Sequence, residues 1–362
     1  MDRFYMERCF ELARKGEASV SPNPMVGCVI VRDDKVVGEG YHRRFGGLHA
    51  EVVALRRAGR RARGATLYVN LEPCSHYGKT PPCVDAIIAA GVKSVVAASK
   101  DPNPLVAGRG FRFLRQSGVH VRVGVLREEA EFLNEKFLTF MKTGMPFVGI
   151  KVAQTLDGRI ADASGSSKWI TGKQARNHAH KLRAQYDAVL VGARTVEHDN
   201  PQLTVRAVKG RNPLRVVVDG RLSCGTGARV FQTRKARTIL LTSSRAMREQ
   251  PNKVQRLSRG GVDVIPVQNG FFLRPHKILE TLAELNVASV LIEGGSNTIG
   301  AFLEAGLAHK VHCFIGPKIL GGGLSGLALP SPLPLMKSIH LKKPRVQQPG
   351  GDILIEGRIF DA

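Results

Sequence analysis

Apolar positions in the first part of the chain follow two kinds of spacing. Helical spacing over residues 2–15 and 49–59 predicts two amphipathic helices, and a glycine ends the second one. Two β-rich runs, 26–31 and 35–42, lie between them and are separated by only three residues. This spacing is typical of a β-hairpin.

Helices and strands then alternate up to residue 125. The pattern predicts strands at 65–70, 93–99 and 119–125 and helices at 81–91 and 108–118. A hairpin followed by such alternation predicts a central sheet covered by helices on both faces.

A domain boundary is expected near residue 144. One helix is predicted over 127–143, ending at Gly144, and a new strand starts at Met145. We therefore expect two domains, 1–144 and 145–362, which agrees with a length of 362 residues. The second part alternates again, with helices expected at 171–185, 277–286 and 298–307 and strands at 188–193, 214–220, 237–243, 289–295, 310–320 and 352–359.

Composition adds little to this picture. Hydrophobic residues make up 43% and charged residues 23% of the chain, as in ordinary globular proteins. No apolar run is long enough to span a membrane, and the acidic, amphipathic N-terminus does not resemble a secretory or transit signal. We expect a cytoplasmic protein. Six cysteines in so long a chain favour free thiols or metal ligands over a disulfide scaffold.

The net charge is unusual, because the chain has 54 Lys and Arg residues but only 30 Asp and Glu residues, which gives a net charge of +24. Such an excess favours anionic partners such as phosphorylated substrates, nucleotides or nucleic acid. The basic residues are spread along the chain and form no tail. We therefore expect a generally basic surface with phosphate-binding pockets, and no specific nucleic-acid or membrane partner.

The segment 70–83, Asn-Leu-Glu-Pro-Cys-Ser-His-Tyr-Gly-Lys-Thr-Pro-Pro-Cys, carries two of the cysteines. Cys74 follows a predicted strand, Cys83 opens a predicted helix, and His49 opens another. One histidine and two cysteines at helix starts suit a tetrahedral zinc with its fourth position open to water, as in catalytic sites. Glu51 follows His49 by two residues and could shuttle protons.

The alternative for these residues is a pair of buried thiols and an unrelated histidine. The order of the three elements, together with Glu51, argues against it. The other four cysteines lie in apolar patterns and are expected in the core: Cys9, Cys28, Cys224 and Cys313.

The His-x-Glu and Pro-Cys elements resemble those of zinc-dependent nucleobase deaminases, although eight residues separate the cysteines here instead of two. Taken with the segments 21–31, 101–110, 150–161, 182–206 and 291–307, this longer form resembles the bifunctional deaminase/reductase family of riboflavin biosynthesis. The resemblance covers nearly the whole chain. It implies an α/β fold class: an N-terminal cytidine-deaminase-like three-layer domain that deaminates a pyrimidine with zinc, and a C-terminal dihydrofolate-reductase-like α/β domain that uses NADPH.

The resemblance also implies a substrate and a product. The deaminase would act on 2,5-diamino-6-ribosylamino-4(3H)-pyrimidinone 5′-phosphate, and the reductase would give 5-amino-6-(5-phosphoribitylamino)uracil. Family members form homo-oligomers, so we expect one here. Two other functions stay open, a nucleic-acid deaminase and a scaffolding protein with structural zinc.

Further site residues are implied by the same resemblance. Substrate contacts would come from Asn23, His42, His76, Lys79, Lys151, Ser167, Arg183, Leu203, Arg206 and Glu293. NADPH contacts would come from Ala153, Trp169, Thr195, Asp199, Gly295, Ser296, Asn297, Thr298, Ile299, Gly300 and Ala301. Arginines suit phosphate because the guanidinium binds it bidentately, and a glycine-rich turn before a helix suits a dinucleotide phosphate.

Several of these residues have simpler interpretations. The insert around His76 and Lys79 could be a solvated loop, Asn23 a turn residue, and Trp169 a core aromatic. The glycines near 295 lack the Gly-x-Gly-x-x-Gly spacing of the Rossmann motif. The family often shows Asp-Asp-Pro where this chain has Asp199-Asn200-Pro201, which leaves the role of Asn200 open.

Overall fold

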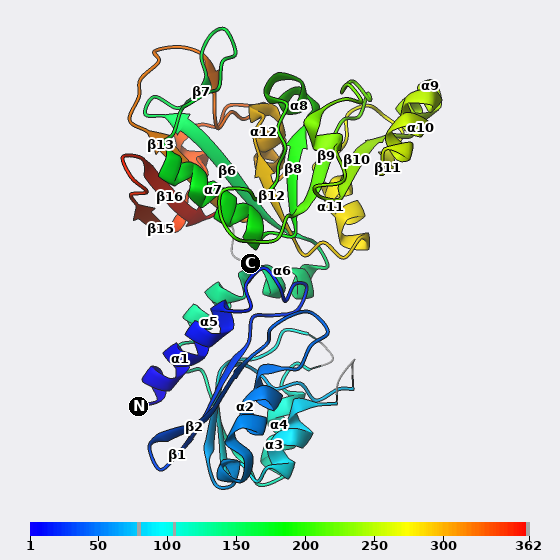
Figure 1. Cartoon of the computed structure of the whole chain (residues 1–362). Helices are drawn as coiled ribbons and strands as arrows, with labels where there is room; N and C mark the ends of the chain where they lie inside the picture. The colour runs from blue at the N-terminus through cyan, green and yellow to red at the C-terminus, as the bar shows by residue number, and fades with distance from the viewer. Residues whose placement is uncertain (78–80, 104–105, 360–362) are drawn as a thin grey trace. The chain divides into compact units, whose positions relative to one another are not determined.

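The structure is a computed structural model that describes residues 1–77, 81–103 and 106–359. The chain divides into two compact units, Met1–Gly144 and Met145–Ala362 (Figure 1). Each unit has its own sheet and its own hydrophobic clusters. None of the helices in the described ranges is long and apolar enough to cross a membrane.

The first unit is built around the strand order β2-β1-β3-β4-β5. Its strands are β1 (Gly27–Arg32), β2 (Lys35–Tyr41), β3 (Thr66–Leu71), β4 (Ser94–Ser99) and β5 (His120–Val123). Its helices are α1 (Asp2–Arg14), α2 (Ala50–Ala58), α3 (Cys83–Ala89), α4 (Arg109–Gln116), α5 (Arg127–Leu133) and α6 (Glu135–Thr143). The predicted hairpin is confirmed, because β1 pairs antiparallel with both β2 and β3, and the remaining pairs are parallel.

Helices cover both faces of this sheet, as the alternation predicts (Figure 1). Residues of α2, α3 and α4 pack with Ile30, Leu67 and Val95 on one face. Residues of α1 and α5 pack with Val29 and Tyr68 on the other. Neighbouring residues of β1, β3 and β4 therefore face opposite layers, which is why these three strands are mostly apolar and buried.

The prediction of one helix over 127–143 is wrong, because α5 and α6 are separated at Asn134. The Asn134 side chain accepts a hydrogen bond from the backbone N–H of Met25 at 2.8 Å and donates one to the Met25 carbonyl at 3.0 Å. A contact with a residue 109 positions away thus fixes the break.

The second unit begins with β6 (Phe147–Thr155) and contains a larger sheet. Its other strands are β7 (Arg159–Ala161), β8 (Ala188–Gly192), β9 (Leu214–Val218), β10 (Thr238–Ser243), β11 (Val262–Gln268), β12 (Ser289–Glu293), β13 (Lys310–Gly316), β14 (Leu324–Ser325), β15 (Lys342–Gln347) and β16 (Ile353–Arg358). Its helices are α7 (Lys173–Gln185), α8 (Ala193–Asp199), α9 (Ser244–Glu249), α10 (Pro251–Arg259), α11 (Pro275–Glu284) and α12 (Ser296–Glu304).

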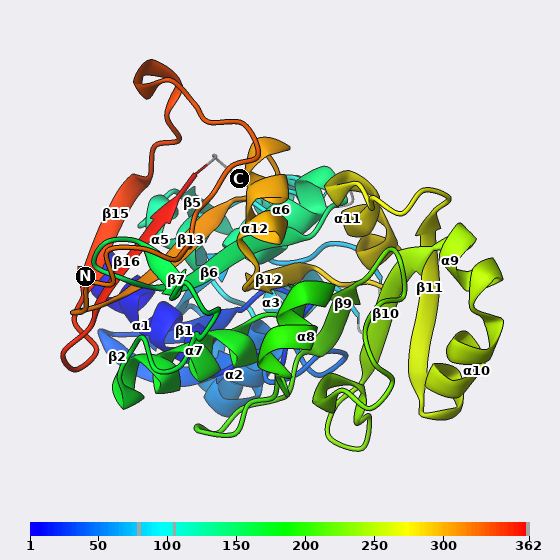
Figure 2. The ribbon, with the colours of Figure 1, turned by 90° about the horizontal axis from the view of Figure 1, so that it is seen from above.

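The strands of this sheet pair in the order β11-β10-β9-β8-β12-β6-β13-β16-β15. Neighbours from β11 to β13 are parallel, and β16 and β15 extend the sheet antiparallel. Helices α7 and α8 lie on one face and α11 and α12 on the other (Figure 2). The carboxyl ends of parallel strands meet at one edge, where ligands bind in open α/β sheets.

Candidate functional site

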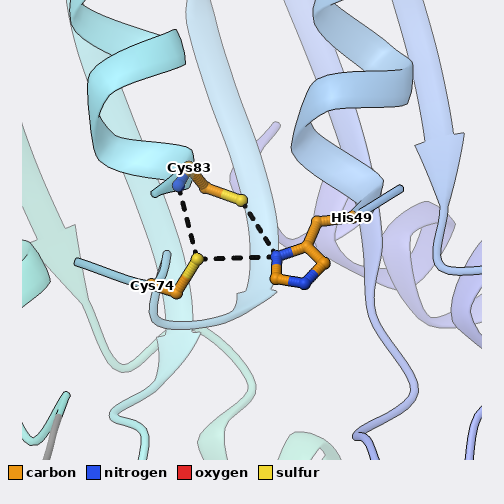
Figure 3. A group of neighbouring side chains, drawn as sticks. All are labelled: His49, Cys74 and Cys83. Atoms are coloured by element: carbon orange, nitrogen blue, oxygen red, sulfur yellow. Dashed lines mark hydrogen bonds between the residues drawn. The ribbon is translucent and has the colours of Figure 1, made fainter. Parts of the chain in front are cut away.

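His49, Cys74 and Cys83 come together in the first unit (Figure 3). His49 is the N-cap of α2, Cys74 follows β3, and Cys83 is the first residue of α3. The His49 Nδ1 atom lies 3.2 Å from the Sγ of Cys83 and 3.5 Å from the Sγ of Cys74. Ligand atoms of all three residues lie within 4.8 Å of one another. One imidazole nitrogen and two sulfurs are a donor set that zinc favours, so these residues fit the metal.

The electrostatics of the cluster favour a thiolate. A hydrogen bond from the Cys83 thiol, with a further one from His49, outweighs burial and lowers the pKa of Cys74 to about 4. The backbone N–H of Cys83 also donates to the Cys74 sulfur at 3.3 Å. Metal ligation requires the deprotonated sulfur, and the surroundings stabilise that form at Cys74 only, because the hydrogen bond to Cys74 and burial raise the pKa of the Cys83 thiol.

Glu51 lies in the first turn of α2 and is only 4% exposed. Burial raises the pKa of its carboxyl above the ordinary value. The charges of His49 and Cys74 also act on it, which places Glu51 in the electrostatic neighbourhood of the cluster.

Asn23 and His42 lie next to the same cluster. The His42 ring is 5.5 Å from the His49 ring, centroid to centroid, in an edge-on arrangement. The Asn23 amide nitrogen lies 3.1 Å from Nε2 of His42, and Nδ1 of His42 lies 3.0 Å from the Leu48 carbonyl. The amide donates to Nε2, so the proton of the neutral ring is on Nδ1. The structure thus brings both residues to the cluster.

The insert between the cysteines is described in part. His76 is half-buried, and its Nδ1 atom is buried without a hydrogen-bond partner among the described residues. Lys79 lies outside the described residues. The four remaining cysteines are buried, which confirms their predicted place in the core: Cys9, Cys28, Cys224 and Cys313.

In the second unit, a buried carboxylate is paired with two cations. Glu293 at the end of β12 accepts two hydrogen bonds from Arg183, at 2.5 and 2.8 Å, and it also forms an ion pair with the Lys151 ammonium at 3.7 Å. Lys151 lies opposite Glu293 in the β12–β6 register, and Arg183 comes from α7. Burial would raise the pKa of Glu293, but Arg183 and Lys151 outweigh it and lower that pKa to about 2.

Arg206 adds a further positive charge near Glu293, Arg183 and the neighbouring His180. Burial, Arg183 and Arg206 lower the pKa of His180 to about 4, so the ring is neutral. The backbone N–H of Arg206 donates to its Nδ1 at 3.4 Å. Leu203 is in the core and only 2% exposed, so in this structure it offers almost no surface to a ligand.

A glycine turn connects β12 to α12 at the carboxyl edge of the sheet. Gly294 and Gly295 have positive φ angles of 87° and 76°, a conformation that glycine adopts without strain. A Cβ at either position would lie 3.0 to 3.3 Å from the Thr195 side chain, which is closer than an ordinary contact. The turn therefore packs closely against Thr195 and leads into the start of α12, where free backbone N–H groups suit a phosphate.

The other residues implied for NADPH differ in accessibility. Asp199, implied for NADPH, accepts a hydrogen bond at 2.8 Å from Ser167, which is implied for the substrate. Ala153 lies on β6, two residues beyond Lys151 and on the same face. Ile299 and Gly300 are buried, so neither offers a surface to a ligand in this structure, while Asn297 is exposed. Ser296, Thr298 and Ala301 are half-buried.

Trp169 is not a core aromatic, since it is 65% exposed. The Arg176 guanidinium lies 4.4 Å from the centre of its ring, within the range of a cation–π contact. The Lys318 ammonium donates to the Trp169 carbonyl at 2.5 Å. The indole is thus held at the surface by its neighbours.

Both units match known families. A family model described as the RibD C-terminal domain matches residues 146–355, and one described as the cytidine and deoxycytidylate deaminase zinc-binding region matches residues 1–99. Riboflavin biosynthesis protein RibD of Aquifex aeolicus is 45% identical over 98% of this chain and 98% of its own. The Escherichia coli protein of the same name is 42% identical with the same coverage.

The chain belongs to the RibD family. Solved structures agree: a diaminohydroxyphosphoribosylaminopyrimidine deaminase/5-amino-6-(5-phosphoribosylamino)uracil reductase from Thermotoga maritima matches with a TM-score of 0.87 at 42% identity. RibD of Acinetobacter baumannii matches with a TM-score of 0.88 at 39% identity, and both matches cover 99% of each chain.

As a RibD protein, the chain is a bifunctional enzyme of riboflavin biosynthesis with a deaminase domain and a reductase domain. The expected fold class, cytidine-deaminase-like followed by dihydrofolate-reductase-like, is confirmed. Its cofactors are zinc and NADPH.

Two structural features of this RibD chain were not predicted from its sequence. Arg176 and His180 lie on α7 with Arg183, and their spacing of four and three residues is a helical-face signal that could have indicated them. Asn200 caps α8 with φ of 41°, and its Oδ1 accepts a hydrogen bond from the Arg229 N–H at 2.8 Å. Asparagine tolerates this left-handed conformation well, which gives a local structural role to the departure from the family.

Proposed function

We propose that the two units catalyse consecutive reactions on one phosphorylated pyrimidine. Residues 1–144 would remove the 2-amino group of 2,5-diamino-6-ribosylamino-4(3H)-pyrimidinone 5′-phosphate by hydrolysis. Residues 145–362 would then reduce the ribosyl group with NADPH to give 5-amino-6-(5-phosphoribitylamino)uracil. The observation that carries the proposal is the convergence of His49, Cys74 and Cys83, with Glu51 two residues from the first ligand.

In the deaminase, the three clustered side chains would hold zinc. When bound, zinc lowers the pKa of water and supplies a nucleophile near neutral pH. Glu51 would take the proton from that water and deliver it to the ring nitrogen and the departing ammonia. Asn23 donates one amide hydrogen to His42, which leaves its carbonyl oxygen and second hydrogen for the edge of a pyrimidine.

In the reductase, Lys151, Arg183 and Arg206 would bind the phosphoribosyl group, with Ser167, Leu203 and Glu293 lining the same site. Glu293 neutralises part of this charge and fixes the Arg183 guanidinium by two hydrogen bonds. NADPH supplies the hydride, and the protein orients it. The glycine turn at Gly294 and Gly295 and the start of α12 would hold the cofactor phosphates.

Mass spectrometry of the pyrimidine phosphate tests both roles. Incubation with the zinc-loaded protein is expected to replace the amino group by oxygen, and two hydrogens are expected to be added only after NADPH is supplied. Deamination without later reduction would contradict the role of residues 145–362. If neither product forms while zinc is bound, the assigned substrate is wrong.

We also propose a cytoplasmic homo-oligomer. All six cysteines are free, as is usual in a reducing compartment. Large apolar side chains are exposed between residues 317 and 341, among them Leu335 at 87% and Met336 at 93%. Apolar surface of this kind marks interaction sites. Sedimentation of the purified chain is expected to give a multiple of 39.3 kDa.

A further inference from the structure

Glu72 lies directly after β3, two residues before Cys74, and is only 3% exposed. Its carboxylate accepts hydrogen bonds from three backbone N–H groups that are distant in sequence: Asp101 at 3.2 Å, Gly108 at 2.9 Å and Phe111 at 3.3 Å. The first of these residues follows β4, and the other two belong to the start of α4. One side chain therefore ties the end of β3 to the first turn of α4.

The next residue is fixed by packing against the same turn. A Cβ at Gly110 would lie 2.2 Å from the Pro73 carbonyl oxygen, so the backbone of α4 is in direct contact with the peptide that enters Cys74. No side chain larger than hydrogen fits there.

Cys74 is also held from its other side. Its carbonyl accepts a hydrogen bond from Val84 at 3.3 Å, and its sulfur accepts one from the backbone of Cys83 at 3.3 Å. The start of α3 therefore holds Cys74 on one side, and the bonds of Glu72 and the contact of Gly110 with Pro73 hold it on the other.

Glu72 does not have the character of a proton shuttle. Its Oε2 accepts two of the three bonds and its Oε1 the third, all from rigid backbone groups. A carboxylate is the side chain that can accept at both oxygens. Glutamine has nearly the same shape but would turn an NH₂ group toward backbone N–H donors.

We propose that Glu72 is a positioning residue of the metal centre, which fixes the backbone of Cys74 so that its sulfur stays at the His49–Cys83 cluster. This inference rests on the proposed zinc ligands. Groups that orient metal ligands typically change metal affinity about 10- to 100-fold when they are mutated.

The test is competition for zinc between a chelator and the full-length protein, for wild type, Glu72→Gln and Glu72→Asp. We expect zinc affinity to fall about 10- to 100-fold in Glu72→Gln. Glu72→Asp, which keeps both oxygens on a shorter side chain, should lie between that variant and wild type. The reductase rate of each variant should match that of wild type and provides an internal control for the second unit.

Ser99→Ala is the matched control for a purely structural effect. Ser99 Oγ donates to the Asn70 carbonyl at 3.2 Å, a buried bond in the same sheet that does not touch Cys74. We expect this variant to lose stability but to keep wild-type zinc affinity.

The outcomes separate this inference from the proposed function. If wild type binds no zinc at these ligands, the metal centre itself is wrong and the inference falls with it. If wild type binds zinc and Glu72→Gln binds it equally well, only the positioning role is overturned. The positioning role is also overturned if Ser99→Ala loses as much zinc affinity as Glu72→Gln when the two variants lose the same free energy of unfolding. If Glu72→Gln does not fold, Glu72→Asp decides by the same criteria.

Discussion

Two buried glutamates, Glu51 and Glu293, have opposite electrostatic surroundings. Burial raises the pKa of Glu51, whereas Arg183 and Lys151 overcome burial at Glu293 and lower its pKa to about 2. A raised pKa suits a group that takes up and releases protons, and a lowered one suits a permanent counter-charge. Under the proposed function, the two units would use glutamate for different chemistry.

Replacing Glu51 by glutamine is expected to lower the deamination rate by about 10²- to 10⁴-fold, because an amide cannot carry the proton. Reduction of pre-deaminated substrate should be unchanged. Separate assays of the two reactions check this. Substitution of the exposed Glu17 in the same unit, Glu17→Gln, serves as the control and should alter neither rate. Loss of both activities in a folded Glu51→Gln protein would contradict two independent sites.

Glu293→Gln is expected to destabilise the second unit by about 3–5 kcal/mol, because it leaves the half-buried Arg183 and Lys151 without their buried counter-charge. Chemical denaturation followed in the second unit measures this. Weak destabilisation, within about 0.5 kcal/mol as at surface sites, would mean that Glu293 is not the counter-charge of this site.

The pH dependence of the same group has a definite sign. The folded-state pKa of Glu293, about 2, lies below its ordinary value of 4.5. Its contribution to stability is therefore complete above about pH 4.5 and is lost as the pH falls towards 2. The difference in stability between wild type and Glu293→Gln should shrink over that window.

The metal ligands and Glu51 could be proposed from spacing alone, because the His-x-Glu and Pro-Cys elements are local patterns. The reductase residues could not, because Lys151, Arg183 and Glu293 lie far apart in sequence and meet only through the pairing of β6 with β12 and the packing of α7. Their assignment came from resemblance.

Helices and strands were predicted best where burial produces a clear pattern of apolar residues. Strand β8 is apolar throughout, and so are the three central residues of β12, because both faces are covered. By contrast, β15 was missed, since it is exposed at every position, contains Pro344 and pairs with β16 at the edge of the sheet. Nothing in its composition distinguishes it from a loop.

The break between α5 and α6 was missed for another reason, since it depends on tertiary contacts with Met25. We expect Asn134→Ala to lower the free energy of unfolding of the first unit by about 1–3 kcal/mol, because it leaves the part-buried backbone N–H of Met25 without its partner. Denaturant titration measures this, with the exposed Asn297→Ala of the second unit as control. An unchanged stability would show that these bonds do not hold the break.

At the scale of the whole molecule, each unit buries its own clusters: those of α1 to α5 in the first, and those of α7, α8, α11 and α12 in the second. A unit with its own core can fold alone. We therefore expect residues 145–362, expressed separately, to fold and to reduce pre-deaminated substrate. Circular dichroism and NADPH oxidation check this, with the full chain as reference. An unfolded fragment would show that the second unit needs the first.

The single tryptophan of the chain makes the molecule its own optical probe. Trp169 is exposed and stacked against Arg176 in the second unit, and the first unit contains no other indole. Intrinsic fluorescence excited at tryptophan therefore reports on one half of the enzyme without background from the other. Titration with NADPH is expected to quench this emission by energy transfer to the nicotinamide, and Arg176→Ala should shift its wavelength even without cofactor. Binding of NADPH to the reductase could thus be followed in the intact enzyme, without a fluorescence signal from the deaminase.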